Sequence, residues 1–282
     1  ISERFPGFNE DIRADMVSEA EAFFAYVLFN DRPLTELFSA DYAVVNHRLA
    51  RFYGLSDVPG SSEGFTRVDG DGQRGGLLRL GAFLARNAGF EDSSLIRRAV
   101  SIRKNMLCHT ILAPDDVVIN SGREEAARDA FEGLTSEQIA ALTTREYIER
   151  LTSPAACAQC HLTMINPLGA GMEAFDAVGQ RRSTDNSQAI DTTGALIGIS
   201  GVHRTDEQIA FAGADELGSI LADQRRTSFC IAQKALTSFT STELQADRTC
   251  MLQPITTNLH DGAPMRALFE SLGALDAVRF RR

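Results

Sequence analysis

The sequence is short of positive charge, of long apolar stretches and of several familiar catalytic patterns. Its 282 residues include 28 lysines and arginines against 38 aspartates and glutamates, which gives a net charge of −10. That balance argues against nucleic acid or an anionic membrane surface as a partner. No apolar run is long enough to span a bilayer. The sequence also lacks a Ser/His/Asp series, a zinc-protease helix and a phosphate-binding loop.

Repeats, low-complexity tracts and a recognisable secretion signal are also missing. A chain of this length can form one large domain or two ordinary ones, and 44% hydrophobic residues are typical of a folded globular protein. Because the chain opens abruptly with Ile-Ser-Glu-Arg-Phe, we expect a processed or incompletely covered N-terminus.

The stretch Cys157–His161 reads Cys-Ala-Gln-Cys-His. Two thiols separated by two residues and followed by a histidine are typical of covalent attachment of a c-type haem. Cys157 and Cys160 would each form a thioether to the porphyrin, and His161 would ligate the iron from the proximal side. Covalent haem attachment is completed outside the bacterial cytoplasm. The motif therefore predicts one covalent haem c in a periplasmic or cell-surface protein.

Three other uses of these cysteines remain open. A redox dithiol usually lies at a strand-to-helix turn of an α/β pattern, which this sequence lacks. A structural zinc site needs a second ligand pair, and Cys108, Cys230 and Cys250 do not have that spacing. A plain disulfide would leave His161 without a role. Haem attachment is the interpretation that uses all of the motif.

The remaining cysteines suggest one disulfide. Cys230 and Cys250 lie in predicted helices, and a bridge between them would close a loop of about 20 residues and contribute roughly 3 kcal/mol. Such a bridge is expected in an oxidising compartment. Cys108 is then left over in an apolar helix, where we expect a buried, inert thiol.

Hydrophobic periodicity predicts a mainly α protein: a helical bundle with a cytochrome-c-like haem-binding segment and one or two short β ribbons. Capping boxes predict helices that begin at Thr135, Thr143 and Thr205, and helical spacing continues from there to the end. The stretch Asn166–Gly171 is predicted to be a loop, with a carbonyl that accepts from Nδ1 of His161. Further helices are expected over 9–29, 43–53, 77–86, 94–112 and 144–151 and in a short segment from Ser153-Pro154, with strands over 65–68 and within 186–201.

The sixth iron ligand is a separate question. Met172 is the first candidate because it follows the predicted flexible loop, and Met106 and His109 are the next to consider. A thioether ligand would raise the potential relative to histidine. An open sixth position is the other possibility. Arg181, with its neighbour Arg182, would pair with haem propionates or would form a solvated basic pair.

Several blocks together resemble the planctomycete-type cytochrome c proteins, which are secreted bacterial proteins built from consecutive domains of unknown function. Their signature reads roughly C-x-x-C-H, then D-P-x-G-F, then E-N-F-D-A-x-G-x-W-R. This sequence departs from it at Asn166, where aspartate is usual, and at Gln180, where an aromatic is common. The blocks that carry the resemblance are 37–54, 74–84, 157–181, 229–230, 247–250 and 280–282.

The resemblance implies a location and a cofactor rather than a reaction. It suggests a helical upstream domain over 1–75 that is truncated at its N-terminus, a haem c-binding domain over 76–185 and a C-terminal helical domain over 186–282. The leading interpretation is a monohaem c-type cytochrome that transfers electrons outside the cytoplasm to a redox partner protein, within a larger multi-subunit assembly. The alternatives are a peroxidase-like haem enzyme with an open distal site and a structural component of a cell-surface assembly that carries haem.

Overall fold

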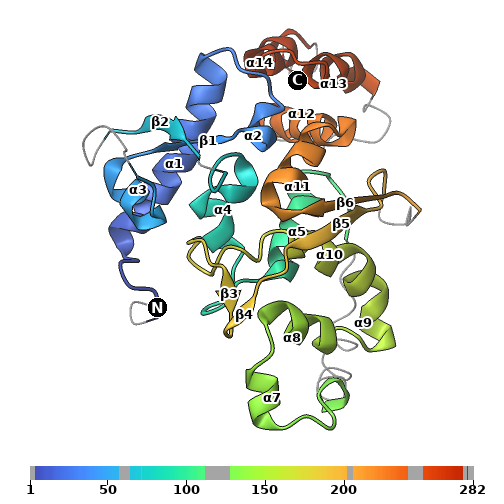
Figure 1. The fold of residues 1–282 in the computed structure, drawn as a ribbon. Helices are drawn as coiled ribbons and strands as arrows, with labels where there is room; N and C mark the ends of the chain where they lie inside the picture. The colour runs from blue at the N-terminus through green and yellow to red at the C-terminus, as the bar shows by residue number, and fades with distance from the viewer. Residues whose placement is uncertain are drawn as a thin grey trace.

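The computed structural model describes residues 4–56, 64–70, 72–111, 128–201, 206–240, 250–275 and 278. Helices dominate these residues, and the strands pair in twos (Figure 1). The prediction of a mainly α fold is confirmed. Within the described part of the chain, no helix has both the length and the apolar composition that crossing a bilayer requires.

The first half of the chain is organised around one long helix. Asn9 caps it, and its side chain accepts a hydrogen bond from the backbone N–H of Ile12 at 3.0 Å. The predicted helix over 9–29 is thereby confirmed. The helical elements of this half are α1 (Glu10–Phe29), α2 (Glu36–Ser39), α3 (His47–Tyr53), the 3₁₀ turn η1 (Leu77–Arg79), α4 (Gly81–Arg86) and α5 (Leu95–Asn105).

Two of the three predicted capping boxes mark helix starts in the second half. Thr135 and Thr143 each cap a helix as predicted. Thr205 lies outside the described residues, and Gln208 lies in a strand, so the helix predicted there is wrong. The helical elements are α7 (Ser136–Ala140), α8 (Thr144–Leu151), α9 (Ala155–Cys160), the π-helical turn η2 (His161–Ile165), α10 (Asn166–Ala170), α11 (Gly213–Ala222), α12 (Arg225–Thr240), α13 (Gln253–His260) and α14 (Met265–Ala274).

The described residues form three antiparallel two-stranded sheets, where one or two ribbons were expected. The strand predicted near 65–68 is present, and it pairs Thr66 with Val45 and Asp69 with Tyr42. The pairs are β1 (Tyr42–Val45) with β2 (Thr66–Asp69), β3 (Thr184–Asp185) with β4 (Gln188–Ala189), and β5 (Thr193–Ile197) with β6 (Gln208–Ala212).

Two predicted helices are shorter than expected. The segment 43–53 begins as β1 because adjacent β-branched Val44 and Val45 favour extended backbone, and α3 starts only after Asn46, which caps it. The helix predicted over 94–112 ends at Asn105, and Cys108 adopts a positive φ of 49°. The polar connector predicted at 113–123 lies outside the described residues.

The disulfide joins Cys108 to Cys230, not Cys230 to Cys250. Their Cα atoms lie 5.3 Å apart, although 122 residues separate them in sequence. The predicted pairing is wrong because the sharp turn after α5 carries Cys108 against α12. Cys108 is therefore not the inert buried thiol that we expected, and Cys250 is exposed.

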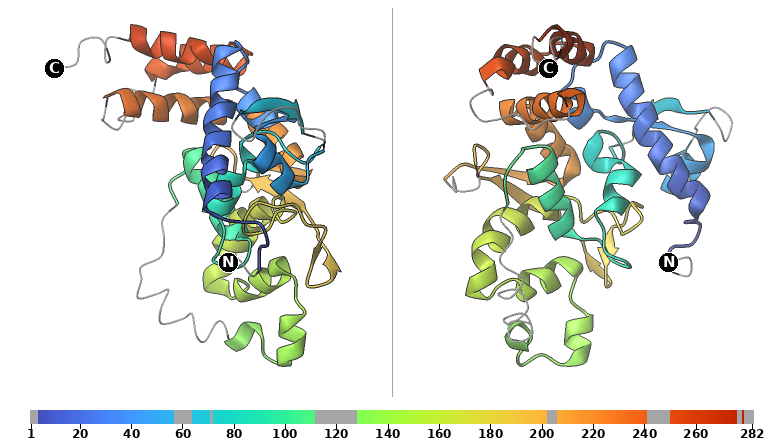
Figure 2. Two further views of the ribbon diagram at one scale, coloured as in Figure 1. Left: turned by 90° about the vertical axis from the view of Figure 1, so that its left-hand side faces the viewer. Right: turned by 180° about the vertical axis from the view of Figure 1, so that it is seen from behind.

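One hydrophobic core runs through the molecule. Its largest cluster contains Phe23 of α1, Ile102 of α5, Leu217 of α11 and Leu268 of α14. Helices α12 to α14 lie at one end and α7 to α9 at the other, with α5 and α11 between them (Figures 1 and 2). The cluster draws on all three predicted domains, and the division at 75 and 185 stays a prediction.

Four buried arginines brace the middle of the fold. This arginine cluster, Arg74, Arg79, Arg98 and Arg103, has at most 5% exposure at any member. Every member donates to backbone carbonyls rather than to solvent. Burial lowers the pKa of Arg98 and of Arg103 to about 10, so both remain charged at neutral pH. The guanidinium groups thus donate hydrogen bonds to backbone carbonyls that lack a backbone N–H partner in a helix or sheet.

Candidate haem site

The motif lies in one helical run, which we call the motif run: α9, η2 and α10, residues 155–170. Pro154 precedes it and its carbonyl accepts from the N–H of Cys157 at 2.8 Å. The prediction that a short helix carries the motif is confirmed. The loop predicted over Asn166–Gly171 is wrong, because its small and apolar residues pack as α10 and proline is tolerated in the first helical turn.

Cys157 and Cys160 are free thiols on one face of α9. Residues three apart in a helix are neighbours on its surface, so the two sulfur atoms are presented together. Cys157 is half-buried and Cys160 is exposed, and neither takes part in the disulfide. Two adjacent thiols at one helix surface are the arrangement that two thioether bonds to a single porphyrin need.

His161 is half-buried and begins the π-helical turn. Burial lowers the pKa of its imidazole, and a hydrogen bond from Nδ1 to the Asn166 side chain at 3.3 Å acts in the opposite direction. The ring is therefore neutral at neutral pH. Neutral imidazole is the form that ligates metals, and the Asn166 contact leaves Nε2 for that purpose.

The π-helical turn brings Asn166 under His161. The backbone N–H of Asn166 bonds to the carbonyl of His161, five residues earlier. In an α-helix those two residues would point in different directions, whereas i→i+5 pairing stacks them. The acceptor for Nδ1 is thus a side-chain amide and not the backbone carbonyl that we predicted.

Helix α5 fixes the motif run in place. Arg103 donates from Nε to the carbonyl of Met164 at 3.0 Å, within η2. At Gly169 an added Cβ would collide with the carbonyl of Leu95, so α10 packs against α5 backbone to backbone. The absence of a side chain at Gly169 thus serves a contact between helices.

The donor set present here fits a haem c. It consists of two free thiols on one face and a neutral imidazole directly after them, with Nδ1 held and Nε2 available. A cluster of three or more metal-ligating side chains, as a structural zinc site requires, is not found in the described ranges. Cys157, Cys160 and His161 would therefore hold the group, two through sulfur and one through nitrogen.

Met172 follows α10 and lies in a turn, not in the motif run. The Met172 side chain has no exposed surface and belongs to the main core. Its carbonyl accepts from Arg98 at 2.7 Å. Met172 as sixth ligand stays a prediction that would require its side chain to leave the core.

The two other candidates for that position are also engaged. Met106 is 6% exposed and packs in the core. His109 accepts from Arg103 at Nδ1 over 3.2 Å, and its Nε2 lies 3.1 Å from the carbonyl of Ile199. Since arginine only donates, Nδ1 is the acceptor and Nε2–H donates to Ile199. Burial, reinforced by Arg103, lowers the pKa of His109 to about 4.

Arg181 and Arg182 are not an equivalent pair. Arg182 is committed to the protein: it pairs with Glu173 at 3.1 Å and with Asp185 at 2.9 Å. Arg181 is exposed and lines a cavity of about 380 Å³ together with Arg79 and Asp215. Only Arg181 therefore remains available to a propionate, and that role stays a prediction.

Sequence reasoning missed the residues that support His161. Thr152 accepts from the Asn166 amide at 2.8 Å, and Arg103 holds the following turn. The departure from the usual aspartate at position 166 was the one available signal. Arg103 gave none, because a basic residue on a predicted amphipathic helix is normally assigned to solvent.

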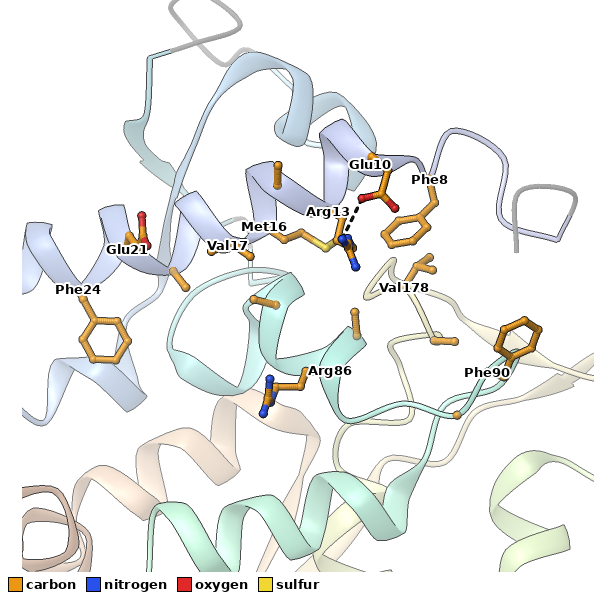
Figure 3. A pocket seen from close by; sticks show the side chains of 16 residues that line it. Phe8, Glu10, Arg13, Met16, Val17, Glu21, Phe24, Arg86, Phe90 and Val178 are labelled. Carbon is orange, nitrogen blue, oxygen red and sulfur yellow. Dashed lines mark ion pairs between the residues drawn. The ribbon is translucent and has the colours of Figure 1, made fainter. Parts of the chain in front are cut away.

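A large groove lies away from the motif run. This groove, of about 920 Å³, separates α1 from α4, and Met16, Val17 and Phe24 give it an apolar lining (Figure 3). Glu10 and Arg13 form an ion pair at its edge over 2.9 Å. Helix α9 lies on the opposite side of the molecule in the views of Figures 1 and 2. None of the predicted site residues lines this groove.

Comparison with known proteins assigns two parts of the chain. Residues 74–185 match PSCyt3, a protein of unknown function (DUF1588), and residues 2–55 match PSD4, a protein of unknown function (DUF1592). No curated protein and no solved structure matches. The PSCyt3 match contains the motif run, and the two matches follow one another as the sequence resemblance implies. Residues 2–55 and 74–185 therefore belong to the domains of unknown function that planctomycete-type cytochrome c proteins contain.

Proposed function

We propose that this protein binds one haem c covalently through Cys157 and Cys160, with His161 as proximal ligand, and transfers electrons outside the cytoplasm. The observation that carries the proposal is the presence of two free thiols on one helical face directly before a neutral imidazole whose Nδ1 is already bonded. When bound, the haem supplies a one-electron couple between ferrous and ferric iron. No other described group is arranged in this way.

The chain's own residues hold the His161 ring and the helical turn beneath it in place. Asn166 and Thr152 fix the plane of the His161 ring, and Arg103 with Gly169 fixes the helical turn beneath it. The exposed Cys160 and Leu162, which is 39% exposed, leave one side of the motif run open to solvent. An accessible edge there suits electron exchange with a redox partner protein, within a larger assembly.

The Cys108–Cys230 disulfide supports a location outside the cytoplasm. Disulfides persist in oxidising compartments and are rare in the cytosol. Covalent haem attachment requires the same side of the membrane. We therefore place the protein in the periplasm or at the cell surface of a bacterium.

Mass spectrometry of the exported protein tests attachment. We expect one haem to remain on the peptide that contains residues 157–161 after denaturation, because thioethers survive unfolding. Cys160→Ala should weaken retention and the double variant with Cys157→Ala should abolish it. Cys250→Ala, outside the motif, is the matched control and should retain the haem. An unmodified peptide in exported wild-type protein would overturn the proposal.

Electron transfer needs a separate measurement. Voltammetry of the haem-loaded protein should show a reversible one-electron wave. In a separate measurement, the ferric haem should oxidise a reduced redox partner protein, at the same rate in repeated cycles. A haem that is attached but not reversibly reduced would contradict this part of the proposal while leaving attachment intact.

A second candidate function is a haem enzyme with an open sixth position. The burial of Met106 and Met172 and the engagement of both nitrogens of His109 favour it. Met172→Leu separates the two functions, because it removes the thioether but keeps the core volume. Ferric haem with a thioether ligand has a weak absorption band at the red end of the spectrum. Loss of that band and a lower reduction potential in the variant would identify Met172 as ligand. A high-spin spectrum in the wild-type protein, unchanged in the variant, would favour the enzyme.

A further inference from the structure

A chain of hydrogen bonds links α8 to the imidazole of His161. The Thr152 hydroxyl bonds to the carbonyl of Ile148 at 2.6 Å, and the Asn166 amide bonds to the Thr152 oxygen at 2.8 Å. Asn166 then bonds to Nδ1 of His161 at 3.3 Å. Thr152 is 6% exposed and Asn166 is 1% exposed, so water does not compete at either residue. These contacts give the amide only one satisfactory orientation.

The direction of each bond follows from the donors available. A carbonyl only accepts, so the Thr152 hydroxyl donates its single hydrogen to Ile148. The Thr152 oxygen must then accept from Nδ2 of Asn166. This leaves Oδ1 of Asn166, which cannot donate, facing His161. Nδ1 of the imidazole must therefore carry the hydrogen, and Nε2 has the lone pair that a metal needs.

The acceptor in this chain is electrically neutral. Ligating histidines commonly donate their other N–H to a carboxylate, a carbonyl or water, and that partner tunes the basicity of the ligand. A carboxylate would add negative charge beside the imidazole and would stabilise ferric over ferrous iron. An amide of the same shape gives orientation without that charge. Asn166 thus orients the imidazole without placing a negative charge beside it, whereas a carboxylate would do both.

We propose that Asn166, oriented by Thr152, is a positioning residue that fixes the tautomer of His161 and, by its neutrality, keeps the reduction potential of the haem iron high. This inference rests on the proposed function, since it concerns the ligand of that same haem. It assigns a role to the position at which the sequence departs from the usual aspartate.

The test compares Asn166→Asp with wild-type protein after haem loading. The change is nearly isosteric, and the Thr152 hydroxyl can turn to donate to the new carboxylate. We expect the equilibrium constant for reduction to fall about tenfold, which corresponds to 59 mV for a one-electron couple. The optical spectrum should keep the same axial ligands. An unchanged potential with haem attached overturns the proposal.

Thr152 provides a second, independent pair of variants. Thr152→Val removes the acceptor and frees the Asn166 amide to turn, which should weaken the hydrogen bond of Nδ1. The reduction potential should then rise, with an increase of less than tenfold in the equilibrium constant for reduction. Thr152→Ser retains the hydroxyl and should leave the potential unchanged. Equal potentials in both variants overturn the proposal even if Asn166→Asp fails to fold.

Failure of the proposed function gives a different result. If the wild-type peptide carries no haem, the proposed function is wrong, and the predicted effect of Asn166 on the reduction potential is wrong as well. Nitrogen NMR of the imidazole in the unloaded protein still tests the tautomer. We expect Nδ1 to carry the hydrogen in wild-type protein and a tautomer mixture in Thr152→Val. A mixture already present in wild-type protein contradicts the fixed orientation.

Discussion

The arginine cluster and the motif run satisfy their polar groups in opposite ways. In the arginine cluster, charged side chains end on backbone carbonyls inside the protein, as Arg98 does on Met172, Phe175 and Asp176. In the motif run, Cys157 and Cys160 have no disulfide, and His161 uses one ring nitrogen out of two. The donors of the first region end inside the protein, with the buried Nε of Arg98 as an exception that has no partner, whereas the second region presents groups that suit an external partner.

This difference indicates which part of the molecule a cofactor would complete. Buried side chains of the protein itself brace the body. The motif run depends on the body through α5, since Arg103 and Leu95 both contact it. Changes in the body should therefore have larger effects than changes in the helix that supports the motif run.

The largest effect is expected from Arg98→Met. The variant leaves three buried carbonyls without their donor, and each unsatisfied group costs about 1–3 kcal/mol, so unfolding free energy should fall by about 5 kcal/mol. Arg97→Met is the matched control, because Arg97 is exposed and donates to one carbonyl only. Chemical denaturation monitored by circular dichroism measures both. Equal losses would show that burial of Arg98 is not what braces the fold.

Loss of the disulfide should rank next. Cys108→Ser opens a loop of 122 residues, for which the chain-entropy model gives about 4.9 kcal/mol. Calorimetry of this variant under oxidising conditions measures the change. Cys250→Ser should leave the cross-linked peptide pair of Cys108 and Cys230 intact in non-reducing mass spectrometry. A pair that contains Cys250 instead would disprove the connection described here.

The contribution of Glu19 to stability should fall as pH rises toward neutrality, whereas that of His109, whose pKa burial lowers to about 4, should rise over the same range. Burial raises the pKa of Glu19 from 4.5 to about 7, so the folded state holds this proton more tightly than the unfolded state. The stabilisation is complete below pH 4.5 and is lost as pH passes through 7, and amounts to roughly 3 kcal/mol. Glu19→Gln should remove this falling contribution, so that in a pH series of melts stability rises more, or falls less, between pH 4.5 and 7 than in the wild-type protein. The raised pKa values of Glu173 and Asp176 act in the same direction as Glu19 and remain in both proteins. An identical slope in the two proteins would contradict the raised pKa of Glu19.

The smallest effect concerns the helix that supports Thr152. Thr143→Ala removes the cap of α8, where the Thr143 hydroxyl accepts from the N–H of Glu146 at 3.2 Å. We expect a loss of about 1 kcal/mol. Thr144→Ala, one residue later, retains the cap and should stay within about 0.5 kcal/mol of wild type. A larger loss of unfolding free energy in Thr144→Ala than in Thr143→Ala would show that the cap at Thr143 is not what stabilises the start of α8.

Local signals in the sequence predicted the elements that depend on local chemistry. The helix expected over 9–29 and the capping boxes at Thr135 and Thr143 all rest on bonds within a few residues. The short helix of the motif belongs with them. Such bonds can be read from spacing alone because both partners are close in sequence.

The incorrect predictions concern contacts between distant residues. Cys108 meets Cys230 because of a turn after α5 that periodicity does not reveal. The stretch after Ile165 is helical because α5 offers a surface on which Gly169 can pack, whereas its proline and glycines taken alone favour a loop. For the site, the roles of the three motif residues stay predictions, and the acceptor for Nδ1 of His161 lies in the predicted stretch but is the side-chain amide of Asn166 instead of a backbone carbonyl.

Gly169 also has a consequence for how this chain can vary. The motif run is continuous from Cys157 to Ala170, so its far end determines where its near end lies. Any side chain at position 169 would push α10 away from the backbone at Leu95. Asn166 lies in the same short helix and bonds to both Thr152 and His161, so the displacement would act on the imidazole contact as well as on the helix packing. A single buried glycine therefore couples the packing of the body to the orientation of His161.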